Sequence, residues 1–209
     1  MNYNQILKEG ENFLKKSNIK NPNLDTELIL SKVINKKREE ILLNSNNKLK
    51  NTDLIKFKSY LFRRHNKEPM AYILGYKHFW KHKFLTNKSV LIPRPDTELI
   101  VEETLKHLPI DKSKKILDVG TGSGCIAVSL IKERPKCAAT AIDISRKALN
   151  VAKTNAKLHQ LENKINFINI AIDKYKWNNY DLVISNPPYI NSIELKRLED
   201  DIKFHEPML

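Results

Sequence analysis

Apolar residues in the first third of the chain recur three or four positions apart, which is the spacing of one buried helix face. We expect three helices in which this spacing holds, with Thr52 as the N-cap of the third. The charged run Arg63-Arg64-His65 is interpreted as a solvated helix end. The pattern predicts a small helical bundle with apolar stripes over residues 3–14, 24–34 and 54–61.

The pattern changes character over residues 67–97. Short aromatic and β-branched runs are interrupted by Gly, Asn and Pro, which is typical of a β-hairpin or an extended linker. Asp96 or Thr97 is expected to cap the helix that follows, whose apolar positions lie within 99–108.

From residue 115 onward, apolar strand-like runs alternate with helical segments. This alternation is typical of a parallel sheet with helices on both faces, so an α/β fold is predicted for the second half. The strands are expected at 116–119, 138–142, 165–170 and 181–184, and the helices between them at 125–131 and 147–159.

The composition fits a globular protein with a buried core. The chain has 209 residues, of which 41% are hydrophobic, so it needs no disulfide or metal to stabilise it. Its two cysteines, Cys125 and Cys137, fit a reducing compartment. The apolar runs are too short to span a membrane, and residues 1–16 lack the apolar core of a secretory signal. A cytoplasmic protein is therefore expected.

A net charge of +13 suggests a polyanionic partner, but Lys outnumbers Arg by 30 to 7. Lys, Asn and Ile are all abundant, as an AT-rich coding sequence would produce, so part of the charge is attributed to mutational bias. The excess is concentrated in residues 1–97, which hold 20 basic and 9 acidic residues. The six His have no ligand spacing, so no metal site is predicted.

A glycine-rich loop follows the first strand of the alternating region. Gly120, Gly122 and Gly124 occupy alternate positions, which permits a tight turn and lets a ligand contact the backbone. The spacing differs from the dinucleotide fingerprint, and no Walker A ending follows. Asp118 just before the loop would repel a phosphate, so it suits a cationic ligand such as a sulfonium. By itself, the glycine trio is also compatible with a structural turn.

Asp143 ends the second strand, where a carboxylate can accept both hydroxyls of a ribose. The alternative is that Asp143 caps the helix starting near Ser145. Taken together, the two features fit S-adenosylmethionine, with Asp118 and the glycine loop at the methionine half and Asp143 at the ribose.

A second constellation, Asn186-Pro187-Pro188-Tyr189, ends the fourth strand. Two prolines fix the backbone and remove N–H donors, so the Asn186 oxygen and the Pro187 carbonyl can hold both hydrogens of an NH₂ group. Tyr189 adds an aromatic wall. This arrangement indicates a receptor for a flat acceptor nitrogen, on a base amine or a side-chain amide, with a rigid turn as the alternative.

These residues resemble the class I S-adenosylmethionine-dependent methyltransferases of the N-P-P-Y group. Within that group, the chain is similar to the peptide chain release factor N5-glutamine methyltransferases. The resemblance covers the whole chain and is carried by Glu68–Gly75, Phe79-Trp80, Leu91–Glu98, Asp118–Ala127 and Asn186–Tyr189.

The resemblance implies transfer of a methyl group from S-adenosylmethionine to the glutamine of the Gly-Gly-Gln loop of release factors. Asn186, Pro187 and Tyr189 are the candidate catalytic residues, and these with Pro188 would hold the glutamine amide. Ala171 aligns near the adenine, where the family often has an acidic-aromatic pair. The expected cofactor-binding residues are Asp118, Gly120, Thr121, Gly122, Ser123, Gly124, Asp143, Ala171 and Asn186.

The family pattern also implies a domain organisation. Residues 1–75 would form a helical substrate-recognition domain, 76–97 a β-hairpin linker, and 98–209 a Rossmann-like methyltransferase domain. Arg94 is interpreted as a structural contact of the linker. The family continues past Glu206-Pro207 into further strands, so we expect an incomplete, mostly parallel sheet. A chain of this length is expected to be poorly soluble or inactive unless the missing part is supplied.

Three other functions stay open at this point. The Asn-Pro-Pro-Tyr chemistry also serves DNA adenine-N6 methyltransferases, for which the basic first half would bind DNA. The signature around Pro93–Glu98 and the lack of a target-recognition domain oppose that function. A glutamine methyltransferase of a ribosomal protein and an inactive remnant are the others. A partner release factor is expected, with nucleic acid only indirectly involved if that factor is ribosome-bound.

Overall fold

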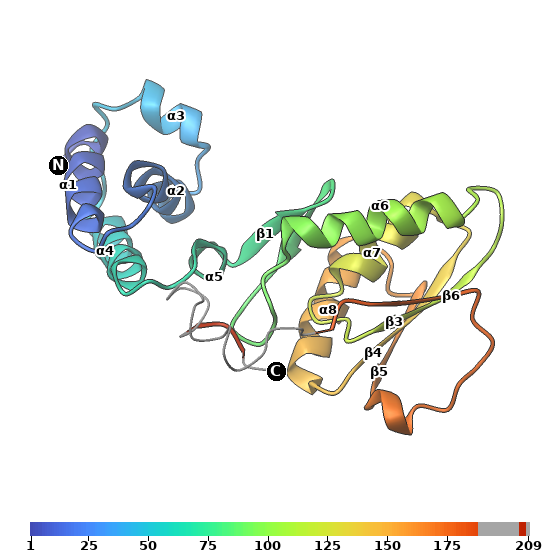
Figure 1. Ribbon diagram of the computed structural model, residues 1–209. Helices are drawn as coiled ribbons and strands as arrows, with labels where there is room; N and C mark the ends of the chain where they lie inside the picture. The colour runs from blue at the N-terminus through green and yellow to red at the C-terminus, as the bar shows by residue number, and fades with distance from the viewer. Residues whose placement is uncertain (188–204, 208–209) are drawn as a thin grey trace. The chain divides into compact units, whose positions relative to one another are not determined.

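The computed structural model describes residues 1–187 and 205–207 (Figure 1). Its contacts divide the chain into a helical unit, holding Met1–Leu74 with His205, and a sheet unit, holding 75–187 with Glu206 and Pro207. The hairpin assigned to a linker by the sequence belongs to the sheet unit. No helix in the described ranges combines the length and the apolar character needed to cross a membrane.

The helical unit forms around the apolar stripes seen in the sequence. Its core includes Ile6, Leu14, Ile29 and Phe57, all buried. At the start of the first helix, Asn2 and Gln5 cap each other's backbone N–H groups. The helices are α1 Tyr3–Lys15, α2 Pro22–Ile34, α3 Arg38–Leu43, α4 Asn51–His65 and α5 Met70–Leu74.

Helix α4 begins at a different residue from the one predicted. It begins at Asn51, so Thr52 lies inside the first turn, and the N-cap residue Lys50 forms no side-chain cap. The expected Thr52 cap is therefore wrong. The apolar periodicity located the helix, but it does not fix a terminus to the residue.

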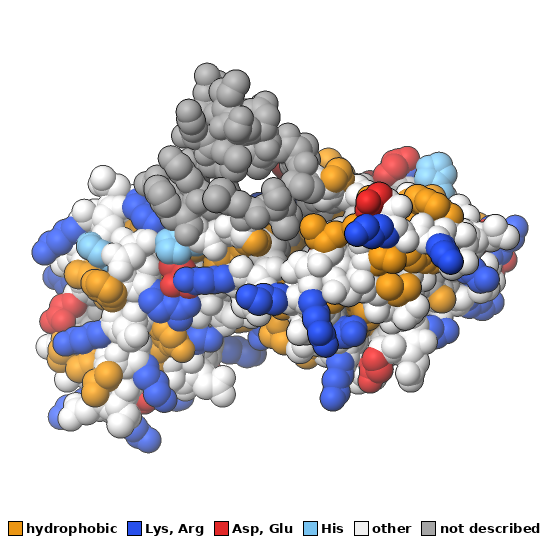
Figure 2. Space-filling model, turned by 90° about the horizontal axis from the view of Figure 1, so that it is seen from below, with side chains coloured by type: hydrophobic (Ala, Val, Ile, Leu, Met, Phe, Trp, Pro, Cys, Tyr) orange, Lys and Arg blue, Asp and Glu red, His pale blue; other side chains and the backbone are white. Residues whose placement is uncertain are grey.

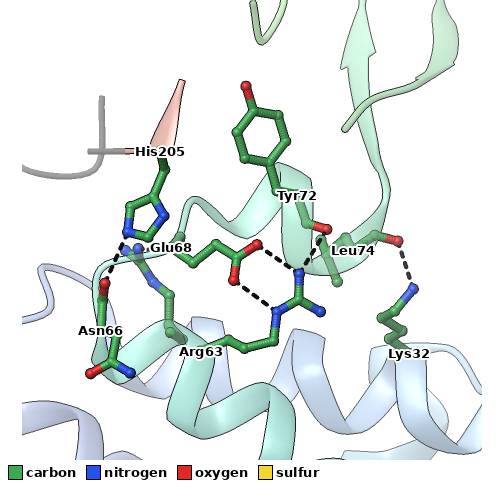
Figure 3. Close-up of polar contacts among 8 residues, drawn as sticks. Lys32, Arg63, Asn66, Glu68, Tyr72, Leu74 and His205 are labelled. Atoms are coloured by element: carbon green, nitrogen blue, oxygen red, sulfur yellow. Dashed lines mark hydrogen bonds and ion pairs between the residues drawn. The ribbon is translucent and has the colours of Figure 1, made fainter. Parts of the chain in front are cut away.

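The charged end of α4 is folded into the unit rather than solvated. Arg64 is 8% exposed, and its Nε donates to Asp25 Oδ2 at 2.7 Å. Arg63 forms a two-pronged pair with Glu68, at 2.8 and 2.7 Å (Figure 3). His65 stacks on Phe13 with ring centroids 4.5 Å apart. The interpretation of a solvated helix end is wrong because α1 and α2 pack against this end of α4 and the chain after it supplies Glu68.

Figure 3 shows two further hydrogen bonds within this unit, in which side chains donate to backbone carbonyls. The Asn66 carbonyl accepts a hydrogen bond from His205 Nε2 at 3.0 Å, and the Leu74 carbonyl accepts one from Lys32 Nζ at 2.8 Å. These bonds satisfy backbone oxygens where α4 and α5 end.

The sheet unit contains a parallel sheet in the order β5-β4-β3-β6 and an antiparallel hairpin of β1 and β2. The α/β class predicted from the sequence is confirmed. The elements are β1 Tyr76–Phe79, β2 His82–Leu85, the 3₁₀ turn η1 Pro95–Thr97, α6 Glu98–His107, β3 Lys115–Val119, α7 Cys125–Glu133, β4 Ala138–Asp143, α8 Arg146–Leu158, β5 Ile165–Asn169, the 3₁₀ turn η2 Ile172–Lys174 and β6 Leu182–Ser185.

The two faces of the sheet are covered differently. One face, including Ile116 and Ala141, shares a buried cluster with residues of α6, α7 and α8. The opposite face packs Leu117 and Ile142 against Tyr175, in the segment between β5 and β6. Within 1–187 and 205–207, the helices therefore cover one face, which corrects the expectation of helices on both. The β5–β6 connection has no apolar run of helical spacing and forms only η2.

Helix α1 approaches α2 closely at Gly10, which has no side chain. A methyl group added there would lie 2.6 Å from Thr26 Cγ2 and 3.1 Å from the Phe57 ring. We predict that Gly10→Ala lowers the free energy of unfolding by about 1 kcal/mol, because overpacking outweighs the better helix propensity of Ala.

Denaturant unfolding of the wild type, Gly10→Ala, Thr26→Ser and the double variant measures this. Thr26→Ser removes the clashing methyl but keeps the hydroxyl that donates to the Pro22 carbonyl at 2.7 Å. The double variant is expected to recover part of the loss. A Gly10→Ala protein as stable as the wild type would contradict the prediction.

Candidate functional site

A cavity of about 340 Å³ opens at the carboxyl ends of β3, β4 and β6. That volume lies within the range of small-molecule sites, and this edge of a parallel sheet is where such folds bind ligands. The walls come from the glycine loop, from the residues after β4 and β6, and from the segment before α6. Lining residues include Val90, Ile92, Arg94, Thr97, Gly120, Thr121, Gly122, Ser123, Asp143, Ile144, Ile170, Ile172, Asn186, Pro187 and Pro207.

The glycine loop is held against the neighbouring strand by its own backbone. The N–H groups of Gly120 and Thr121 donate to the Ile142 carbonyl at 2.9 and 3.1 Å. Gly124 begins α7 with φ +79°, and an added methyl would lie 3.1 Å from Ala152 Cβ. Gly124 thus serves the contact between α7 and α8, and the cavity is lined by 120–123.

Asp143 connects the loop to the start of α8. Its Oδ2 accepts from the Gly122 N–H at 2.9 Å, and its Oδ1 accepts from the Ser145 N–H at 2.8 Å. Ser145 is the side-chain cap of α8, accepting from the Ala148 N–H at 3.2 Å. A carboxylate has about four acceptor positions, so Asp143 keeps capacity for further donors from the cavity.

Asn186 follows β6 and also lines the cavity, as does Pro187. The Asn186 Nδ2 donates to the hydroxyl of Thr97 at 3.0 Å, which leaves its Oδ1 directed elsewhere. Pro188 and Tyr189, predicted to complete this constellation, lie outside the described residues, so their roles stay predictions.

Arg94, which lines the cavity, forms an ion pair with Glu206. Arg94 Nη2 contacts Glu206 Oε1 at 2.5 Å, and the Ile92 N–H donates to Glu206 Oε2 at 3.4 Å. The Glu206 side chain is 3% exposed and the Arg94 side chain 33%, so the carboxylate of the pair is shielded from water. The sequence suggests a structural role for Arg94, and Glu206 is its partner in that role. Sequence reasoning missed Glu206 because the two residues are 112 positions apart.

Comparison with known proteins gives the family. A family model described as "Methyltransferase small domain" matches residues 97–199, and the "PrmC N-terminal domain" matches 5–75. "Release factor glutamine methyltransferase" of Buchnera aphidicola is 38% identical, with 95% of this chain and 73% of that relative covered. The protein of the same name from Caulobacter vibrioides is 37% identical, with 94% and 68% covered.

The chain belongs to the release factor glutamine methyltransferases. The predicted family resemblance is thereby confirmed, and the chain is an enzyme of the methyltransferase class. It is also 36% identical to a "Bifunctional methyltransferase" of Rickettsia typhi, over 97% of this chain and 43% of that relative.

Within this methyltransferase fold, Asp118 lies beneath the loop rather than in the cavity wall. The residue is 1% exposed, Thr121 Oγ1 donates to its Oδ2 at 2.7 Å, and its buried Oδ1 has no partner among the described residues. Burial raises the pKa of Asp118 to about 6, and the nearby Asp143 charge adds to this effect. Asp118 is not among the residues that line the cavity, whereas Thr121 is, so the expected contact of Asp118 with a sulfonium stays a prediction.

The expected adenine contact at Ala171 also stays a prediction. Its neighbours Ile170 and Ile172 line the cavity, and Ala171 is not among the lining residues. Ile144, which follows Asp143, is exposed and adds a third apolar side chain to this wall. The family resemblance thus located the segment, and the isoleucines that flank Ala171 line the cavity.

Asn155 on α8 is a support that sequence reasoning missed. This buried side chain accepts from the Leu85 N–H at 2.7 Å and donates to the Leu85 and Ser123 carbonyls at 3.0 and 2.9 Å. It therefore joins the hairpin to the glycine loop. Its position as a polar residue on the otherwise apolar face of α8 is the sequence signal that could have identified it.

The burial of Asp118 makes stability depend on pH. Because its folded-state pKa of about 6 lies above the ordinary 3.8, the folded protein binds more protons than the unfolded chain between these values. We predict that the free energy of unfolding falls by about 2 kcal/mol from this residue as the pH rises from about 4 to 6.

Denaturant unfolding at a series of pH values tests this, with Asp118→Asn as the variant that cannot ionise and should lack the decline. Thr121→Val removes the hydrogen bond that favours the charged form, so it should raise the pKa of Asp118 further. A carboxyl titration that places Asp118 at or below its ordinary pKa would contradict the prediction.

Proposed function

We propose that this chain transfers the methyl group of S-adenosylmethionine to the side-chain amide nitrogen (N5) of the glutamine in the Gly-Gly-Gln motif of class 1 peptide chain release factors. The observation that carries the proposal is the position of Asn186, whose amide is held by Thr97 at the edge of the cavity that the glycine loop and Asp143 also line. The family names of the Buchnera and Caulobacter relatives support the same substrate.

The residues present fit this cofactor. Asp143 retains acceptor positions for the ribose hydroxyls, and Ile144, Ile170 and Ile172 offer an apolar wall for the adenine ring. The loop 120–123 lines the part of the cavity proposed for the methionine half. When bound, S-adenosylmethionine supplies a methyl group on a positively charged sulfur.

Asn186 and Pro187 are proposed to hold the glutamine amide by its two hydrogens. An amide nitrogen is a weak nucleophile because its lone pair is delocalised into the carbonyl. Acceptors at both N–H groups favour the charge that develops on nitrogen as the N–C bond forms and the S–C bond breaks. The sulfur keeps the electron pair of the broken bond, and the nitrogen then loses a proton to solvent. Tyr189 and Pro188 are proposed to complete the amide site.

The helical unit is proposed to contact the release factor. It exposes the apolar side chains of Leu43, Ile55 and Phe62, of the kind found in protein interfaces. It holds 15 Lys and Arg against 8 Asp and Glu in residues 1–74. In the view of Figure 2, the described Lys and Arg side chains are spread over the visible surface.

Methyl transfer to purified substrates tests the proposed function. Labelled S-adenosylmethionine is expected to methylate a class 1 release factor but not its variant with Ala in place of the Gly-Gly-Gln glutamine. Asn186→Ala is expected to lower transfer at least about 100-fold, because one of two transition-state acceptors is lost. Label on duplex DNA or a ribosomal protein instead, or undiminished transfer by Asn186→Ala, would refute the proposal.

Cofactor affinity gives a separate prediction. Asp143→Asn is expected to weaken binding of S-adenosylhomocysteine about 10- to 100-fold, because charge-assisted hydrogen bonds to the ribose are lost. Calorimetric titration measures this. Asp173→Asn, an exposed carboxylate on η2, is the matched control and should bind as the wild type does. Equal affinity in the two variants would show that Asp143 does not hold the ribose.

A further inference from the structure

Thr97 occupies the position from which a threonine ordinarily caps a helix, yet it forms no side-chain cap at the start of α6. Its backbone is helical, with φ −69° and ψ −19°, so the hydroxyl is turned away from the first N–H groups of that helix. Instead, the hydroxyl accepts the hydrogen bond from Asn186 Nδ2 at 3.0 Å. Of the two expected caps, Asp96 and Thr97, Thr97 does not cap α6, and its side chain is available for another role.

This contact holds the Asn186 amide by its Nδ2 end, so Oδ1 is the end that remains for a substrate. An Asn side chain has nearly the same shape after its oxygen and nitrogen exchange places, but the two ends differ in chemistry. With Nδ2 bonded to Thr97, the Oδ1 acceptor is presented to a substrate N–H. In the reversed orientation, the Asn186 NH₂ would face the substrate NH₂, donor against donor.

Both sides of Thr97 are anchored. Its own N–H donates to the Arg94 carbonyl at 3.1 Å, and Arg94 is held by the shielded Glu206. On the other side, Glu98 Oε1 accepts from the Trp80 N–H at 2.7 Å, which fixes the start of α6 on the hairpin. Thr97 itself is 7% exposed. The Thr97 hydroxyl is therefore carried by a backbone segment that hydrogen bonds fix on both sides of Thr97.

We infer that Thr97 is a positioning residue for methyl transfer, holding the Asn186 amide with its oxygen toward the substrate nitrogen. The inference rests on the proposed function, since it assigns Thr97 a part in that same site. It also assigns a role in the reaction to the segment Pro93–Glu98, which the sequence analysis singled out only as a family signature.

Three variants separate positioning from packing. Thr97→Val keeps the shape and burial but removes the hydroxyl, whereas Thr97→Ser keeps the hydroxyl. Thr104→Val removes a hydroxyl of equal burial on α6 that does not line the cavity. We expect Thr97→Val to lower kcat about 10- to 100-fold, the scale of a misplaced reacting group, with affinity for S-adenosylhomocysteine changed less than about 2-fold. Thr97→Ser and Thr104→Val should stay within about 3-fold of the wild-type kcat.

A second readout does not depend on activity. The side-chain amide signal of Asn186 in a ¹⁵N NMR spectrum is identified by its loss in Asn186→Ala. In the wild type, one Nδ2 proton should be shifted downfield and protected from exchange, and Thr97→Val should abolish both effects. This result distinguishes the inference from the proposed function, because it holds whichever substrate is methylated. An Asn186 signal unchanged in Thr97→Val, or a kcat loss in Thr97→Ser as large as in Thr97→Val, would overturn the inference.

Discussion

The register of three parallel strands determines where the chemistry of this chain can occur. Val119, the last residue of β3, pairs with Ile142 of β4 and with Ser185 of β6. The next residues along the three strands are Gly120, Asp143 and Asn186, which therefore come level at one edge of the sheet. A shift of one residue in either pairing would turn the strand's buried side chains to the opposite face, so the packing of both faces enforces this alignment.

The polar side chains at that edge of the sheet are held in place by hydrogen bonds to other groups of the protein. Asp143 accepts hydrogen bonds from backbone N–H groups of the glycine loop and of the start of α8, and Asn186 donates one to the Thr97 hydroxyl. Such contacts hold a site close to its working geometry, so less ordering is required when the substrates bind. Asp118 contributes differently: its buried carboxylate fixes Thr121 in the loop at a cost in desolvation.

The sequence predicted the elements well where the pattern is local. The strands and helices after residue 115 appear within a few residues of their expected bounds, because each apolar run is bounded by polar residues, Gly or Pro. The glycine loop, Asp143 and Asn186 were located for the same reason, since each lies at or directly after the end of a strand. Arg64, interpreted as solvated, is buried because Asp25 lies 39 residues earlier in the chain. Thr97 and Glu206 were missed as partners of Asn186 and Arg94 because periodicity carries no information about side chains 89 or 112 positions apart.

Asn155 illustrates how much of the sheet unit depends on a single side chain. Its amide pairs with both the N–H and the carbonyl of Leu85, much as an adjacent strand would, and also reaches the Ser123 carbonyl. An aspartate has no hydrogens for the two carbonyls, and a glutamine is one methylene too long for the same spacing. The hairpin and the glycine loop thus share one hydrogen-bonding partner, so a displacement of either one would strain the bonds that Asn155 makes to the other.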